Sequence, residues 1–316
     1  MAQGDDNLDG KFDVLVFGDI CVDLIISGNN VVPEFGQKEK LVEDYSLEMG
    51  GSCTIFACQT AKLGLKTVVA GKVGNDRFGE VVTGTLAEAG VALDYIKKDN
   101  SLKTGISVAL NTGNDRAILT YSGTIDSMEP EDVDYELLKS VRHLHIGSYF
   151  LMKKLQPCYM DIIQAVKKNG GTISLDTNWD PEEKWDSGVM DVIKLVDIIF
   201  PNENEAMAIM KEDSAQKALD RLKQLVPIVA VKMGAEGAVT HFSGNTIKTP
   251  AIEVDKIDAV GAGDSFDGGF LYGFLNGKSI EECARIGCIC GSLNTRASGG
   301  TRGQPRLEEI HKYNKA

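Results

Sequence analysis

The sequence predicts an α/β fold whose mostly parallel sheet is covered by helices on both faces. Strand-like and helix-like segments alternate along most of the chain, and glycines mark many of their ends. The 316 residues suffice for one large α/β domain or two smaller ones. Hydrophobic residues make up 43% of the chain and charged residues 25%, which is the balance of a globular protein with a sizeable core.

The alternation begins within the first hundred residues. Residues 12–26, FDVLVFGDICVDLII, are apolar and β-branched, as in a buried strand. Residues 53–64 carry apolar side chains at helical spacing and end on a glycine. Residues 66–74 predict a second strand and residues 78–91 a second helix. A parallel pair of strands joined by a helix follows from this order.

Two stretches interrupt the alternation. Residues 27–50 lack a helical period, and residues 94–124 read as short strands with a turn at NTGND. GISVAL and RAILTY flank this turn like the strands of a hairpin. We expect both stretches to form a small antiparallel sheet, which could serve as a lid or a subunit contact.

The alternation returns from residue 129 onward. Predicted strands cover residues 141–150, 170–180, 196–206, 228–239 and 246–254. Predicted helices cover residues 157–170, 204–210, 215–225 and 266–277, with a final long helix at 279–300.

Charge and cysteine usage exclude several classes of protein. The net charge of −13 argues against nucleic acid as a partner, because its phosphates need a basic surface. Nucleotides remain possible, since they bind in local pockets as magnesium complexes. Seven cysteines without a paired CxxC spacing predict free thiols in a reducing cytosol rather than disulfides or a zinc site. The polar start and the lack of a long apolar run predict a cytoplasmic protein with no membrane partner.

The stretch DAVGAGDSFDGGFL at residues 258–271 places glycines just before a predicted helix. Unpaired N–H groups and the helix dipole favour an anion at such a start, and glycines let the backbone approach it closely. Read alone, the stretch fits equally well an ordinary turn in which Asp264 is the N-cap.

Four patterns in order resemble the ribokinase-like (phosphofructokinase-B) carbohydrate kinases. DAVGAGDSFDGGFL resembles the C-terminal signature of that family, and GGSCTIFACQTAKLGLKTVVAGKVG at residues 50–74 resembles its N-terminal signature. PNENE resembles the NxxE motif at Asn202 and Glu205, and VKMGAEG resembles the nucleotide-loop pattern. The resemblance covers essentially the whole chain. It implies a three-layer αβα sandwich, with a kinase core at 1–26, 50–93 and 125–316 and a β lid at 27–49 and 94–124.

The resemblance implies transfer of the γ-phosphoryl group of ATP to a hydroxyl. Asp264 would accept the proton of the attacking alcohol, which is a poor nucleophile without a base. The N–H groups of Gly261, Ala262 and Gly263 would form an anion hole for the transferring group. We expect the same helix dipole to keep Asp264 ionised.

The nucleotide and metal sites are implied by the remaining motifs. Asn202 and Glu205 would order Mg²⁺ through water, since Mg²⁺ keeps several waters; a polar helix start is the alternative. Asp258 and the Val260 carbonyl match positions where some relatives hold a monovalent cation such as K⁺. The expected contacts of ATP are Asn202, Lys232, Gly234, Gly237 and Gly263.

The acceptor is the least defined part. The residues expected to bind it are Asp19, Asp23, Gly50, Gly51, Ile55 and Ser148. Ile55 stands where the family signature has asparagine, so an apolar group replaces an amide, and Ala259 departs from the residues usual beside Asp258. Ile55 slightly favours a nucleoside over a sugar as acceptor.

Three other functions of the chain are considered. A nucleoside kinase of the same family and a catalytically silent sugar or nucleotide sensor are the alternatives on this fold. A nicotinamide-dependent dehydrogenase lacks its glycine fingerprint. A homodimer through the lid is also expected.

Overall fold

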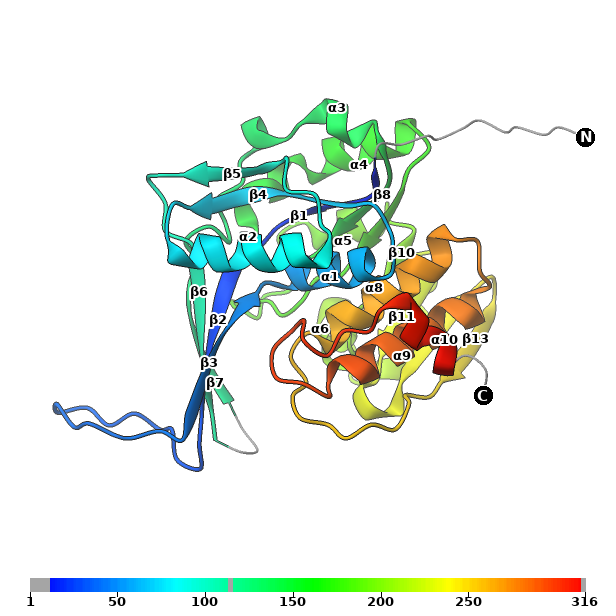
Figure 1. The fold of residues 1–316 in the computed structure, drawn as a ribbon. Helices are drawn as coiled ribbons and strands as arrows, with labels where there is room; N and C mark the ends of the chain where they lie inside the picture. The colour runs from blue at the N-terminus through cyan, green and yellow to red at the C-terminus, as the bar shows by residue number, and fades with distance from the viewer. Residues whose placement is uncertain (1–11, 113–115, 314–316) are drawn as a thin grey trace, which may run out of the picture.

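The computed structural model describes residues 12–112 and 116–313. The polar start at residues 1–11 and part of the predicted NTGND turn lie outside the described residues. Within that part of the chain, the strands form a nine-stranded sheet and a separate four-stranded sheet. Figure 1 shows helices on both sides of the large sheet, which confirms the predicted three-layer α/β architecture.

The large sheet is parallel over seven adjacent strands, because β11 and β10 continue in the same direction through β9, β8, β1, β4 and β5. Only β12 and β13 run antiparallel, at one edge. In spatial order the strands are β13 (Asn245–Thr249), β12 (Ala238–Phe242), β11 (Ile228–Lys232), β10 (Ile198–Ile199), β9 (Thr172–Leu175), β8 (Val141–Ile146), β1 (Phe12–Phe17), β4 (Thr67–Gly74) and β5 (Ile96–Asp99).

Helices cover the two faces of the parallel strands. α1 packs against α2 and α8, and α8 packs along α9, so these four helices lie on one face. α3 and α4 lie on the opposite side of the strands in Figure 1. The helices are α1 (Ser52–Lys62), α2 (Arg77–Ala89), α3 (Tyr135–Leu138), α4 (Tyr159–Lys168), α5 (Val189–Ile193), α6 (Glu203–Met210), α7 (Ala215–Leu222), α8 (Ala262–Leu275), α9 (Ile280–Asn294) and α10 (Leu307–Tyr313).

The small sheet projects from the large one and carries a long connecting loop, residues 28–43, at its far end (Figure 1). Its strands lie in the order β3 (Asp44–Gly50), β2 (Cys21–Ser27), β6 (Gly105–Asn111) and β7 (Arg116–Tyr121). β6 and β7 pair antiparallel, which confirms the predicted hairpin. β2 and β6 pair parallel, so the sheet is mixed rather than wholly antiparallel.

Several predicted boundaries were wrong. Residues 12–26 are two strands in different sheets, separated at Gly18–Ile20, because a uniformly apolar run does not reveal where a chain leaves one sheet for another. β5 joins the large sheet instead of the lid. The strand predicted at 246–254 ends at Thr249, before a proline that cannot donate to a ladder. The helix from residue 279 ends at Asn294, and α10 follows it.

The core lies between the sheet and its helices. The parallel strands are buried almost throughout, as the continuous apolar runs of the sequence predict. All seven cysteines are buried and free, which confirms the expected reduced thiols. Among the described residues, no helix has the length and apolar character needed to cross a membrane.

Candidate active site

The carboxyl ends of five neighbouring parallel strands meet at one edge of the large sheet. β1, β8, β9, β10 and β11 end there, and each delivers a polar side chain just at or beyond its last residue. These side chains are Asp19, Ser148, Asp176, Asn202 and Lys232. In open α/β sheets, ligands bind at this edge, so the fold itself indicates a binding site here.

The predicted glycine turn forms the start of α8. Gly261 is the N-cap residue, with a φ of 72° in the left-handed region. A Cβ atom at Gly261 would lie 2.7 Å from the carbonyl oxygen of Gly300, so a larger residue would meet both backbone strain and a clash. Asp264 lies in the first turn of the helix and is not its cap, contrary to the simpler interpretation of the turn. No side chain caps this helix start, although the N–H of Ala262 donates to the carbonyl oxygen of Ala259 at 3.2 Å.

Asp264 is buried at the helix start, and burial affects its pKa more than any other cause. Burial, together with the nearby Asp176 and Asp19, raises the pKa of Asp264 well above its usual range. Lys232 and a hydrogen bond with Ser52 oppose this rise without cancelling it. The direction of the shift is opposite to the effect expected of the helix dipole. A raised pKa makes the carboxylate a stronger proton acceptor once it is ionised.

The NxxE motif caps helix α6. The side chain of Asn202 accepts a hydrogen bond from the N–H of Glu205 (2.9 Å), and the carboxylate of Glu205 accepts one from the N–H of Asn202 (2.8 Å). Burial first, and Asp176 second, raises the pKa of Glu205 to about 7. The structural alternative, a capping box, is thus present. It still leaves Glu205 close enough to Asp176 and Lys232 to feel their charges.

The donor set around Glu205 fits a hydrated magnesium ion better than a dehydrated one. Within the described residues, no three carboxylate, imidazole or thiol side chains converge as metal ligands. Carboxyl groups nevertheless outnumber cations here, since Asp176, Glu205, Asp264 and Asp267 all interact with the single ammonium of Lys232. Excess negative charge without a closed set of ligands suits Mg²⁺ that keeps its waters.

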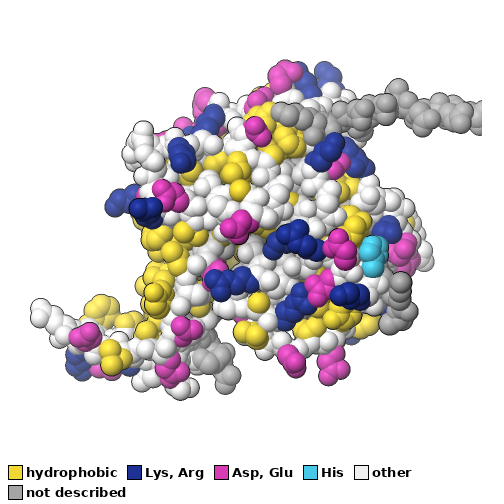
Figure 2. All heavy atoms as spheres, in the orientation of Figure 1, with side chains coloured by type: hydrophobic (Ala, Val, Ile, Leu, Met, Phe, Trp, Pro, Cys, Tyr) yellow, Lys and Arg dark blue, Asp and Glu magenta, His cyan; other side chains and the backbone are white. Residues whose placement is uncertain are grey.

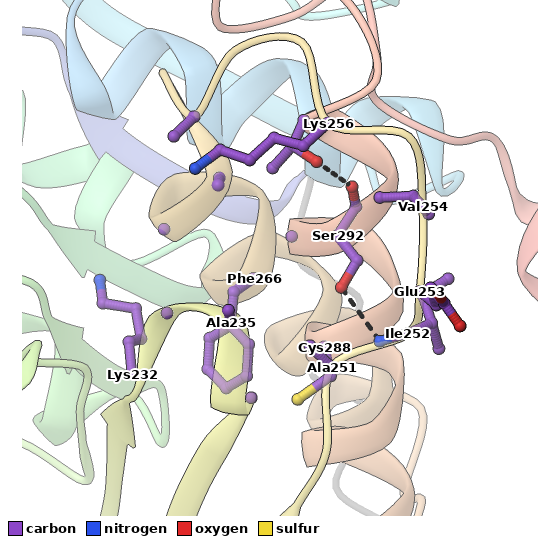
Figure 3. Close-up of a pocket in the computed structure, with 17 residues that line it drawn as sticks. Lys232, Ala235, Ala251, Ile252, Glu253, Val254, Lys256, Phe266, Cys288 and Ser292 are labelled. Carbon is purple, nitrogen blue, oxygen red and sulfur yellow. Dashed lines mark hydrogen bonds between the residues drawn. The ribbon is translucent and has the colours of Figure 1, made fainter. Parts of the chain in front are cut away.

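A cavity of about 480 Å³ opens beside the start of α8. Figure 3 shows Lys232 on one side of it, Phe266 and Ala235 below, and the segment of Ala251 to Lys256 along its far wall. Gly234, Gly237, Ala262 and Gly263 also line it. The nucleotide-loop glycines and the glycine turn, predicted separately, therefore border one space of the size that small ligands occupy.

Gly237 lets the nucleotide loop lie against the neighbouring strand. Its φ is 94°, and a Cβ atom there would lie 2.0 Å from the carbonyl oxygen of Thr249. Gly234, with a φ of 56°, would meet nothing within 4 Å. Gly237 is thus required by packing, whereas Gly234 is required by its backbone conformation alone.

Two of the predicted acceptor residues, Asp19 and Ser148, belong to a hydrogen-bonded group near Asp264. Asp19 accepts hydrogen bonds from the N–H groups of Ser52 and Cys53, both at 3.0 Å, and from the hydroxyl of Ser148 at 2.5 Å. Asp19 thereby caps α1 from outside that helix. Burial nonetheless raises its pKa. Asp19 holds the local structure together, and most of its hydrogen-bonding capacity is in use.

Asn178 links Ser148 of this group to Ser52, which is a hydrogen-bond partner of Asp264. Its side chain donates to the hydroxyl of Ser52 (2.9 Å) and accepts from the N–H of Ser148 (2.9 Å). Ser52 in turn hydrogen-bonds Asp264. Asn178 and Ser148 both have φ in the left-handed region, at 54° and 48°. Such strain in non-glycine residues is typical of functional sites.

Asp23 lies on the lid side of the cleft. On β2, it is paired with Glu48 of β3 and with Ser107 of β6, so these three side chains share one face of the small sheet. A Cβ atom at Gly50 would lie 2.3 Å from an oxygen of Asp23, which explains the glycine there. Glu48 forms an ion pair with Arg302 at 2.7 Å, linking the lid to the C-terminal loop.

Ile55 does not point toward the group around Asp19. It is only 3% exposed, and its side-chain atoms lie 2.3 Å and 2.9 Å from the Cβ positions that Gly300 and Gly261 would have. Gly51, by contrast, has a φ of 87° and lies against the carbonyl oxygen of Asp19. Ile55 thus packs beneath the glycine turn, and its place in the acceptor site, with the slight preference for a nucleoside, stays a prediction.

The residues predicted to hold a monovalent cation are engaged with protein groups. Asp258 accepts hydrogen bonds from the N–H groups of Val260 (3.1 Å) and Gly299 (3.0 Å). The Val260 carbonyl accepts one from the side chain of Asn294 (2.8 Å). These contacts tie the loop before α8 to the loop after α9.

Sequence reasoning missed Ser52, Asp176, Asn178 and Asp267. Asp176 and Asn178 lie near the end of the strand predicted at 170–180, in LDTN, and Asp267 lies one helical turn after Asp264 in GDSFDGG. Polar residues at a strand end and at i+3 on a helix were therefore the available signals.

Comparison with known proteins agrees with this site. Residues 11–307 match the pfkB family carbohydrate kinases, so the chain belongs to that family. A curated ATP-dependent ribose-1-phosphate kinase of Halopiger xanaduensis is 26% identical, over 83% of this chain and 84% of its own. Fructokinase-2 of Solanum lycopersicum is 25% identical, over 94% of each. The crystal structure of a protein described as Ribokinase II from E. coli, in complex with ATP and Mg²⁺, has a TM-score of 0.84 and 25% identity, covering 96% of this chain and 99% of that one.

Proposed function

We propose that the protein is an ATP-dependent kinase that phosphorylates a hydroxyl of a small sugar or sugar-like acceptor. The observation that carries the proposal is the position of Asp264. It lies at the start of α8, with the 480 Å³ cavity on one side and the hydrogen-bonded group around Asp19 on the other. A base between a donor site and an acceptor site is what in-line phosphoryl transfer requires.

At the donor end, the cavity takes the nucleotide. Lys232, Gly234, Gly237 and Gly263 contact ATP, and the N–H groups of Gly261, Ala262 and Gly263 receive the negative charge that develops on the phosphoryl oxygens. Bound ATP and Mg²⁺ in the related E. coli structure support this assignment. Asn202 and Glu205 order the waters of Mg²⁺, which supplies charge neutralisation to the phosphates when it is bound.

At the acceptor end, Asp264 accepts the proton from the attacking hydroxyl. Asp23, which lies next to Gly50 and Gly51, binds other hydroxyls of the acceptor from the lid side. Ser148 and Asp19 form the remaining part of the acceptor site. The two relatives named above act on different acceptors at similar identity, so family membership does not select the sugar.

The small sheet acts as the lid of this site and as a subunit contact. Its two faces differ, because the face of Asp23 mixes polar residues with Ile25 and Ile118, whereas the opposite face carries Leu24, Ile26 and Leu110. On that apolar face Tyr45 is 70% exposed and Leu119 is 66% exposed. Figure 2 shows apolar side chains gathered along the lid side of the molecule. A second copy of the chain would cover this face.

Potassium remains a prediction for Asp258 and the Val260 carbonyl. A cation there would replace the hydrogen bond from Asn294, so a rate that rises with KCl but not with NaCl or tetramethylammonium chloride would support it.

The deciding experiment is an acceptor screen. ATP consumption with Mg²⁺ is measured over pentoses, hexoses, keto-deoxy acids, polyols and nucleosides, each with the Asp264→Asn variant in parallel. Acceptor-dependent ADP formation by the wild type alone supports the proposal. Tight nucleotide binding without turnover on any acceptor would instead indicate a sensor.

A further inference from the structure

A buried lysine stands between two buried carboxyl groups at the start of α8. The Nζ atom of Lys232 lies 2.6 Å from Oδ2 of Asp176 and 3.3 Å from Oδ2 of Asp267. The side chain of Lys232 is 13% exposed and that of Asp267 is fully buried. Taking an ammonium out of water is costly unless close partners compensate. These two carboxyl groups, from the end of β9 and from α8, therefore fix the ammonium in place.

The ammonium lies directly against the glycine turn. A Cβ atom at Gly263 would lie 3.3 Å from Nζ of Lys232, so the ammonium borders the space that a side chain at this position would enter. Lys232 also lines the cavity at the nucleotide end, where Figure 3 shows its amino group directed toward the helix start. A phosphoryl group transferred from a nucleotide in the cavity to a hydroxyl beside Asp264 would therefore lie close to this ammonium.

The ammonium keeps one donor unused. An ammonium group has three N–H donors, and within the described residues Asp176 and Asp267 are the only hydrogen-bond partners of Nζ. The third N–H is free for an oxygen of a ligand in the cavity. A lysine with a purely structural role is expected to donate all three of its N–H groups to acceptors of the protein.

The pKa values of the two carboxyl groups shift in opposite directions. Burial, and then Asp176, raises the pKa of Asp267 well above its usual range, against the opposing effect of Lys232. Burial would also raise the pKa of Asp176, but Lys232 and a hydrogen bond with Asp267 lower it overall. Asp176 is therefore the stronger counter-charge to the ammonium, in agreement with its shorter distance to Nζ.

We propose that Lys232 is a catalytic residue that donates its free N–H to an oxygen of the transferring phosphoryl group, and that Asp176 and Asp267 are the positioning residues that aim it. The inference rests on the proposed kinase function. In that reaction the acceptor oxygen bonds to the γ-phosphorus as the bond to the β–γ bridging oxygen breaks. ADP leaves with that electron pair, and the hydroxyl proton passes to Asp264. Lys232 stays protonated throughout and opposes the charge on the phosphoryl oxygens.

The test separates the γ-phosphate from the rest of the nucleotide. Dissociation constants for Mg-ADP and for Mg-AMP-PNP, a non-hydrolysable ATP analogue, are measured by calorimetry in Lys232→Met. We expect the affinity for AMP-PNP to fall at least about 10-fold relative to ADP and kcat to fall roughly 10²–10³-fold, as for the loss of one donor to a developing anion. Lys248→Met is the matched control, because Lys248 is an exposed lysine paired with Glu236. It should change neither quantity.

A second variant covers the case in which Lys232→Met fails to fold. The double variant Lys232→Met/Asp176→Asn removes an ammonium and a carboxylate together, so no buried charge loses its counter-charge. Melting temperatures are recorded for both. If a folded variant keeps the wild-type ratio of AMP-PNP to ADP affinity and a kcat within threefold, Lys232 is only a structural cation. Absence of any acceptor-dependent turnover in the wild type would overturn the kinase reaction, while the affinity ratio would still report on Lys232.

Asp267→Asn tests the positioning role. It keeps the size of the side chain and removes its carboxyl group, so Lys232 loses one of its two carboxyl partners. We expect kcat to fall between about 3-fold and 100-fold, because small misplacements of a catalytic group are costly, with the KM for the acceptor unchanged. An unchanged kcat together with an unchanged affinity ratio would remove Asp267 from the proposal.

Discussion

The start of α8 and the small sheet both depart from the usual arrangement, in which polar groups are exposed and apolar groups are buried. At the start of α8, Asp264 and Asp267 are ionisable groups buried among protein atoms, beside the largely buried side chain of Lys232. On the small sheet, Tyr45 and Leu119 are large apolar groups exposed to solvent. Both arrangements are costly for an isolated chain. Each is explained when a ligand at the first region and a partner at the second are counted as part of the molecule.

The two regions of the molecule are suited to different tasks: the start of α8 to chemistry and the small sheet to recognition. Buried carboxyl groups have shifted pKa values and fixed positions, as acid–base and electrostatic catalysis need. Among the described residues, the small sheet contacts α1 and α2, and its Val22 and Met49 are buried in the main core. Tyr45 and Leu119 lie on the face opposite Asp23, so a partner on that face can be removed without substituting a reacting group. The following predictions separate the two regions, beginning with the largest effect.

Asp264→Asn should cause the largest loss of activity among these variants. It keeps the size of the side chain but removes the base, so we expect kcat to fall roughly 10²–10⁴-fold. Nucleotide affinity should change little. Because the pKa of Asp264 is raised, wild-type activity should be lost on acidification at a higher pH than an ordinary aspartate would give, as protonation removes the proton acceptor. Steady-state rates across pH check both points.

Asp191→Asn is the matched control for this change, because Asp191 lies on α5 in an exposed pair with Lys194. It should leave the rate unchanged. A near-native kcat in Asp264→Asn would refute the base assignment, whatever the pH profile.

Ile55→Asn now tests stability more than the acceptor profile. The amide would be buried beneath Gly261 and Gly300 without a partner, which costs about 1–3 kcal/mol. We expect a lower melting temperature and a lower kcat on every acceptor alike. Ile55→Val, which removes one methylene, should cost only about 0.5–1.5 kcal/mol. A changed ranking of acceptors at an unchanged melting temperature would restore the sequence-based assignment of Ile55 to the acceptor site.

Sequence and structure differ most clearly over contacts that span long separations. The glycine turn and Asp264 are neighbours in sequence, so their association is local and predictable. Lys232 meets Asp176 and Asp267 across 56 and 35 residues, and no periodicity reveals that pairing. Ile55 fell in a signature position, yet its direction depends on a loop far along the chain. Order along the chain predicted the sheet and its helices, but not which strand left for the lid.

Glu205→Gln should have a moderate effect on the metal. Asn202→Ala and Glu205→Gln should each raise the Mg²⁺ concentration for half-maximal rate by roughly 10-fold, by analogy with other outer-shell ligands. Asn204→Ala and Glu203→Gln, on the same helix start, are matched controls that should not change it. An unchanged Mg²⁺ requirement in both site variants would leave only the capping role.

The pKa of Glu205 adds a stability test without metal. The pKa is about 7 in the folded chain against 4.5 for an ordinary glutamate, so the folded state binds more protons between these values. Stability therefore falls as pH rises from 4.5 to 7. Glu205→Gln should flatten that part of the curve and melt higher than wild type at pH 8. A wild-type pH dependence in the variant would assign the effect to another group.

The double variant Tyr45→Glu/Leu119→Glu should have the smallest effect on chemistry. Both side chains lie on the apolar face of the small sheet, opposite Asp23, so two charges there oppose burial against a second copy. We expect a dimer in the wild type and a monomer in the variant by light scattering, with kcat within about threefold because the buried groups are untouched. Tyr135→Glu, at an exposed tyrosine on α3, is the matched control and should leave the dimer intact. A wild type that is monomeric at micromolar concentration would contradict the dimer. A large loss of kcat in a stable monomeric variant would show that the small sheet and the start of α8 are coupled, and that their separation in this comparison is wrong.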